Sequence, residues 1–197
     1  MRTSHASPEG NGRLTAMTGV VLFVLLALEG VTVLQVGALL TAHVVIGMIL
    51  VPPVLVKLAS TGWRMARYYL GDPAYRRKGP PALLLRLLGP FDVVLTVAVF
   101  ASGIALLYVP AGSRSQVLFV HKASFVLWFC AMSVHVLGHV LDTAKLAPRD
   151  YLPASRRTAP GAAWRAGTLA ASLVAGVALA ALVAPQASHW IGSSFGQ

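Results

Sequence analysis

The sequence predicts an all-α integral membrane protein, a bundle of five transmembrane helices. Hydrophobic residues make up 56% of the 197 residues and charged residues only 11%, which is too little polar surface to cover a soluble globule of this length. A helix that spans about 30 Å of hydrocarbon needs roughly 20 apolar residues, and five runs are long enough. We expect these helices near 14 to 37, 39 to 58, 90 to 109, 117 to 141 and 165 to 185.

The first run resembles a signal peptide only at its start. Arg2 and Arg13 precede its apolar core, but apolar sequence continues past Glu29 and no small-residue cleavage pattern follows. We therefore expect a retained helix over 14 to 37.

Prolines predict the shape of the next two helices. Pro52 and Pro53 should kink the second helix. Gly89 and Pro90 should start the third, which places Asp92 in its first turn, where the helix dipole favours a carboxylate.

The last run differs in kind, because it has no histidine and is rich in Ala and Gly. Gly167, Ala171 and Ala175 recur at intervals of four, a pattern that lets helices approach closely. We expect a packing helix that either closes the side of a four-helix core or binds a partner subunit.

The distribution of Lys and Arg predicts the orientation in the membrane. Arg114 and Lys122 lie on one side, and the other 14 of the 16 basic residues lie in the N-terminal tail and in the connections 57 to 89 and 142 to 165. The positive-inside rule then gives a cytoplasmic tail over 1 to 13, a single transmembrane domain over 14 to 186 and an external tail over 187 to 197, in the plasma membrane.

The positions of the basic residues, the single cysteine and the lengths of the connections exclude several function classes. The basic residues sit between apolar runs, so we expect contact with membrane lipid and no nucleic-acid binding. The one cysteine, Cys130, cannot form an intrachain disulfide or a paired-cysteine metal site. No connection is long enough for a nucleotide-binding fold, and we expect no catalytic residues of a complete oxidoreductase.

Histidines in the apolar runs are the candidate functional residues. His43 lies near the outer end of the second helix and His121 near the outer end of the fourth, so two imidazoles from parallel helices share one depth. His135 follows His121 by 14 residues, about 21 Å along the axis, on the same face, and His139 lies one turn further.

Two imidazoles at one depth satisfy a six-coordinate haem iron, which needs a nitrogen on each face of the macrocycle. Gly47, one turn after His43, leaves room for a ring edge, and Arg114 and Lys122 are placed to meet the propionates. There are two alternatives to haem binding for the histidine pair, an interhelical hydrogen bond and a proton relay. The alternative for Lys122 is that its side chain extends to the membrane interface.

His43, His121 and His135, with their helix order, resemble the membrane core of the cytochrome b superfamily, including bacterial di-haem b-type cytochromes. The resemblance covers the first four helices. It implies that His43 and His121 bind an outer haem b, that His135 is half of an inner site, and that electrons pass between quinone and a redox partner protein.

The inner site departs from the family pattern, because the position 14 residues after His43 is Lys57. A lysine must lose its proton before it binds iron, and beside the cytoplasmic interface the ammonium is favoured. His135 or His139 then pairs with Lys57, binds a quinone headgroup or bonds to neighbours. We expect one haem and leave a second open.

Glu29 is expected in the outer half of the first helix, near the level of His43. There it orients His43, accepts protons at a quinol site or makes a structural hydrogen bond.

The sequence therefore predicts a membrane-bound b-type cytochrome that carries electrons between the quinone pool and another protein. The alternatives are a transporter or proton relay using Glu29, His135 and His139, and a non-catalytic assembly subunit.

Overall fold

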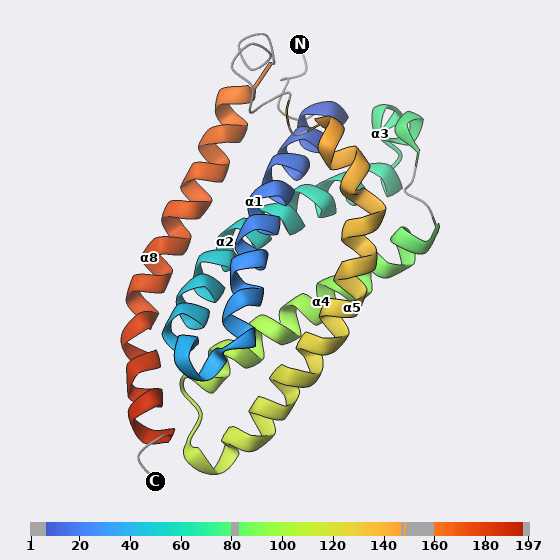
Figure 1. Cartoon of the computed structure of the whole chain (residues 1–197). Coiled ribbons are helices and arrows are strands. Elements are labelled where there is room, and N and C mark those ends of the chain that lie inside the picture. Colours follow the sequence, from blue (N-terminus) through green and yellow to red (C-terminus); the bar gives the residue numbers. More distant parts are fainter. Residues whose placement is uncertain (1–6, 80–82, 147, 149–159, 195–197) are drawn as a thin grey trace. The chain divides into compact units, whose positions relative to one another are not determined.

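A computed structural model describes residues 7–79, 83–146, 148 and 160–194. Its elements are α1 (Pro8–Leu34), α2 (Val36–Tyr69), α3 (Pro73–Lys78), α4 (Leu83–Leu106), the 3-10 turn η2 (Ala111–Ser113), α5 (Arg114–Leu146) and α8 (Ala162–Ser194), shown in Figure 1. In this described part, five helices are long and apolar enough to cross a membrane, and no strand is present. The expected fold class, an all-α multi-pass membrane protein, is confirmed.

The helices extend beyond the apolar runs that predicted them. α1 begins at Pro8 rather than near 14, because Ser7 caps it: the Ser7 hydroxyl accepts the Gly10 N–H at 3.0 Å, and Pro8 fits the first helical position. α2 continues to Tyr69 and α8 to Ser194. The tails expected over 1 to 13 and 187 to 197 are therefore helical over 8–13 and 187–194, since helical hydrogen bonding does not stop where the apolar sequence does.

The prolines act differently from expectation. α4 begins at Leu83, so Pro90 lies inside the helix and the placement of Asp92 in a first turn is wrong. In α2 the backbone dihedrals depart from helical values at Leu39 (φ −112°, ψ 20°), whereas Pro52 and Pro53 continue the helix. Each proline removes one N–H from the helical hydrogen bonds, and the helix continues on both sides of it.

The chain folds as two compact units. Unit 1 comprises Met1–Pro80 and Val140–Leu182, and unit 2 comprises Pro81–His139 and Val183–Gln197. His43 and Lys57 belong to unit 1, and His121, His135 and His139 to unit 2.

In unit 1, α1 and α2 form a tight antiparallel hairpin joined at Gln35, visible as the blue and cyan helices in Figure 1. A polar ladder fastens the end away from this turn. Asn11 Nδ2 donates to Ser60 O at 2.9 Å, the Thr15 and Ser60 hydroxyls lie 2.9 Å apart, and Lys57 Nζ donates to Thr15 O at 2.8 Å. These bonds satisfy polar groups that are buried between the two helices.

A short turn follows α2 at its polar end. Arg67 pairs with Asp72 and its guanidinium lies 5.6 Å from the centre of the Trp63 ring. Asp72 caps α3, and the Ala74 N–H and the Arg67 guanidinium hold the pKa of Asp72 below its usual value. This turn lies outside the apolar part of the span.

Within unit 1, α8 approaches α2 at Gly176. A Cβ added at Gly176 would lie 2.6 Å from the carbonyl oxygen of Ile49, whose usual helical partner, four residues on, is Pro53 and has no N–H. The small residues expected to allow a close approach were Gly167, Ala171 and Ala175, but all three are exposed, and nothing lies within 4 Å of a Cβ added at Gly167. Gly176, which makes the close contact with α2, lies on a different side of α8 from these three residues.

Replacing Gly176 with alanine should therefore destabilise unit 1 by about 1–3 kcal/mol, because a methyl group has no space against the α2 backbone. Gly167→Ala in the same helix is the matched control and should be neutral or stabilising, since its methyl group meets open space. Thermal unfolding in detergent, followed by size-exclusion chromatography, measures both. Equal melting temperatures for the two variants would contradict this account of the contact.

In unit 2, α4 and α5 run antiparallel and are joined by polar contacts at intervals of seven residues along α5. The pairs are Ser102 with His121 at 3.1 Å, Thr96 with Trp128 at 2.9 Å and Asp92 with His135 at 3.0 Å. Because 3.5 residues per turn keep one stripe of a helix facing its neighbour, His121 and His135 both face α4.

Candidate functional site

Two acidic side chains of the apolar spans each contact a histidine. Glu29 Oε1 lies 3.0 Å from His43 Nδ1 in unit 1, and Asp92 Oδ2 lies 3.0 Å from His135 Nδ1 in unit 2. A carboxylate in hydrocarbon requires such a partner. His121 and His139 lie on α5, the helix that also carries His135.

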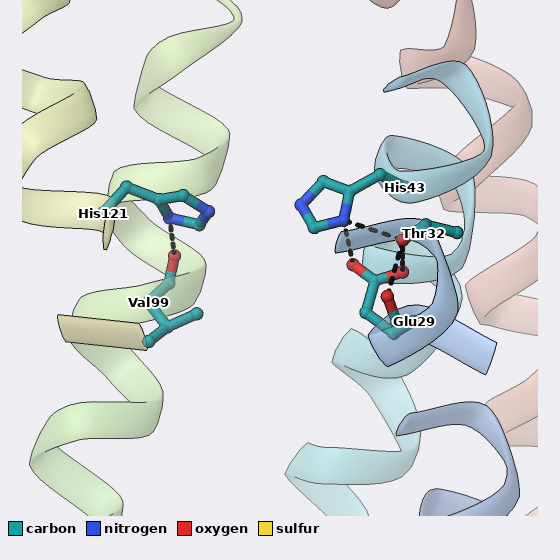
Figure 2. A network of polar contacts seen from close by, with 5 residues as sticks. All are labelled: Glu29, Thr32, His43, Val99 and His121. Atoms are coloured by element: carbon teal, nitrogen blue, oxygen red, sulfur yellow. Dashed lines mark hydrogen bonds and ion pairs between the residues drawn. The ribbon is translucent and has the colours of Figure 1, made fainter. Parts of the chain in front are cut away.

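His43 is held on its Nδ1 side by α1. Thr32 Oγ1 lies 3.0 Å from His43 Nδ1 and donates its own hydrogen to Glu29 O at 2.6 Å, so the hydroxyl oxygen acts as acceptor toward the ring. With Glu29 Oε1 also beside Nδ1, the network in Figure 2 favours a hydrogen on Nδ1. Nε2 then carries the lone pair, which is the form that binds a metal.

His121 is held in the same way, but by uncharged groups of α4. Its Nδ1 lies 3.1 Å from the carbonyl oxygen of Val99, as Figure 2 shows. It also lies 3.1 Å from Ser102 Oγ. Ser102 donates to Ala98 O at 2.6 Å, and a carbonyl only accepts, so Nδ1 carries the hydrogen. Nε2 of His121 is again the nitrogen with the lone pair.

Glycines give these side chains their space. A Cβ added at Gly103 would lie 3.1 Å from His121 Cε1, so Gly103 allows the ring to lie against α4. A Cβ added at Gly47 would lie 3.5 Å from Glu29 Oε1. Gly47 was expected to leave room for a ring edge, and the structure places the Glu29 carboxylate beside it.

Asp92 and His135 form the pair that sequence reasoning missed. Asp92 is only 4% exposed, and the rings of His135 and His139 lie 4.8 Å apart, centre to centre, at 53°. Asp92 was placed at a helix start because Gly89-Pro90 suggested one. An antiparallel register of the third and fourth helices, counted from the turn between them, would have brought it to the level of His135.

Lys57 points to α1. Its ammonium donates to Thr15 O at 2.8 Å, and a Cβ added at Gly19 would lie 3.0 Å from Nζ. Gly19 therefore makes space for this ammonium, and the lysine joins the ladder between α1 and α2.

The two cations expected to meet propionates lie at the start of α5, and Lys122 is exposed. Among the described side chains, no group of three or more His, Cys, Asp or Glu residues is arranged to hold a metal ion alone. A haem iron requires only two axial ligands from the protein, because the macrocycle supplies the others. The donor chemistry of His43 and His121, two imidazoles with the hydrogen on Nδ1, fits that requirement.

Fold and site together define a multi-pass helical membrane protein with intramembrane histidines that are oriented by carboxylate, hydroxyl and carbonyl oxygens. No protein-family model, curated protein or solved structure matches the chain.

Proposed function

We propose that the protein is a membrane-embedded b-type cytochrome that carries electrons between the quinone pool and a partner protein, with one haem b bound by Nε2 of His43 and Nε2 of His121. The observation that supports this most is the shared arrangement at Nδ1, where oxygen atoms hold both rings in the ligand form. Their equal depth, estimated from the sequence, adds to it. The bound haem supplies reversible one-electron transfer.

The two proposed ligands differ in what holds them. The Glu29 carboxylate lies next to His43 and would make that ring a stronger donor to a bound haem, which would favour the oxidised state. Val99 and Ser102 orient His121 without adding charge. Glu29 is thus a positioning residue that tunes the reduction potential of the proposed haem. Arg114 and Lys122 are the proposed partners of the haem propionates.

The deciding experiment is an optical spectrum of the detergent-purified protein, oxidised and then reduced with dithionite. Low-spin b-haem bands that sharpen on reduction are expected. A preparation that is monodisperse, expressed with ample haem and still colourless would overturn the proposal.

Gly103→Ala provides a finer test of the His121 site. The added methyl group would lie 3.1 Å from the ring, so it should tilt His121 and reduce haem content at least about threefold, a loss of about 0.6 kcal/mol or more in binding. Gly89→Ala in the same helix is the control and should bind haem normally, because nothing lies within 4 Å of its added Cβ. Equal haem content in both variants would contradict the placement of the ring.

The proposed orientation has the N-terminus in the cytoplasm. In a Cys130→Ser background, cysteines at Ser113, before α5, and Ser194, at the end of α8, should react with an impermeant maleimide in intact cells. A cysteine at Ser155, which lies outside the described residues, should react only after lysis. The reverse pattern would place His43 and His121 at the cytoplasmic side.

A further inference from the structure

The proposed haem leaves three titratable side chains of unit 2 without a role. Asp92 is buried, its Oδ2 lies 3.0 Å from His135 Nδ1, and His139 lies one turn along α5 with its ring 4.8 Å from that of His135. A purely structural hydrogen bond between α4 and α5 would need only one donor and one acceptor. Here a carboxylate and two imidazoles gather in an apolar span, where each charge is unfavourable unless it is balanced.

Charge balance fixes how many protons the Asp92 and His135 pair prefers. With one proton between them, the pair is net neutral, either as carboxylate and imidazolium or as carboxyl and imidazole. A second proton leaves a net charge of +1, which His139 can share. The pair can therefore hold either one proton or two across the 3.0 Å contact between Asp92 Oδ2 and His135 Nδ1.

The neighbours of this pair on both helices are mostly uncharged. Thr96 and Trp128 bond to each other one step toward His121, and Gly138 packs against Leu85 on the other side. The nearest charged residue on α4 is Arg86.

Charged and titratable residues recur toward the end of α5, where Asp142 and Lys145 are exposed. Along α5, the next titratable side chain after His139 is that of Asp142, about one turn further on. Along α4, no charged residue lies between Arg86 and Asp92.

We propose that Asp92, His135 and His139 form a proton-exchange site. One proton enters from water at the end of α5, binds His139 and passes to the Asp92–His135 pair, whose net charge rises from zero to +1; release follows the same route in reverse. The step moves a proton only and needs no oxidant or reductant. It does not rest on haem binding, and His135 acts here as a proton carrier.

Infrared difference spectroscopy of the full-length protein in phospholipid vesicles, cycled between about pH 5 and pH 8, tests the site over the range in which imidazoles exchange protons. Wild type should show coupled carboxyl and imidazole bands. The carboxyl band should vanish in Asp92→Asn and persist in Asp142→Asn, the control on the same route. After a pH jump, His139→Leu should slow the response about tenfold, equivalent to about 1.4 kcal/mol in the barrier.

Should Asp92→Asn fail to fold, wild-type protein labelled with carbon-13 aspartate and Asp142→Asn keep the assignment possible, because the chain has only four aspartates. A spectrum with no titrating buried aspartate would overturn the proposal. So would an unchanged response rate in His139→Leu, or loss of a haem from His135→Gln. Because the bands are measured with or without haem, a colourless protein that passes this test would separate the proton site from the proposed cytochrome function.

Discussion

Replacing either His43 or His121 with alanine should abolish the low-spin haem spectrum. Each ring is held at Nδ1, and both rings would be needed to hold the haem, so the loss of either should leave it weakly bound. Dithionite-reduced minus oxidised spectra, with haem content per mass of protein, give the result. Either variant retaining a wild-type spectrum would exclude that residue as a ligand.

Added imidazole distinguishes loss of a ligand from loss of the fold. The alanine variants should elute as wild type from size exclusion, and imidazole should restore low-spin bands by entering the space left by the side chain. Glu29→Gln is the matched variant for His43, because it keeps the shape and removes the charge. It should retain the spectrum and raise the midpoint potential by about 59 mV for each 1.4 kcal/mol of lost stabilisation of the oxidised state. No rescue, with normal elution, would contradict direct ligation.

The sequence predicted the fold class and the five spans because the bilayer itself imposes the pattern, a minimum apolar length without charge. It could not predict the helix ends. Hydrocarbon thickness says nothing about where hydrogen bonding continues in the interface, and the cap at Ser7 lies before the apolar run. Small-residue spacing likewise indicated a packing helix, but the contacting glycine, Gly176, depends on a carbonyl exposed by Pro53 in another helix.

At the site, local topology decided which expectations could be made. Glu29 was expected near His43, and the structure brings them together, because a hairpin joined at Gln35 lets depth be counted from the turn on both helices. Asp92 was misplaced because a proline was taken as a helix start, which shifted its environment from core to cap. Side-chain direction was beyond the sequence altogether: Lys57 has the reach to point several ways, and the open space at Gly19 decides its direction.

The purified protein should hold one haem rather than two. His135 has a carboxylate at Nδ1, as His43 does, so the local contacts of His135 do not show whether it binds a second haem. Lys57, the residue expected opposite His135, distinguishes one haem from two. Lys57 Nζ donates to Thr15 O at 2.8 Å, within a ladder that also holds Ser60 and Asn11. For this amine to bind iron, it must lose a proton and give up its hydrogen bond to that carbonyl.

A pyridine haemochrome assay against protein mass should therefore give a ratio near one, and His135→Ala should leave both the ratio and the low-spin spectrum nearly unchanged. Lys57→Met keeps the apolar stem and removes the charge, so it should also retain the haem. It should lower the stability of the α1–α2 hairpin by about 1–3 kcal/mol, because the hydrogen bond between the Lys57 ammonium and Thr15 O is lost. A ratio near two that falls to one in both variants would instead show that Lys57 leaves Thr15 to clamp a second haem with His135.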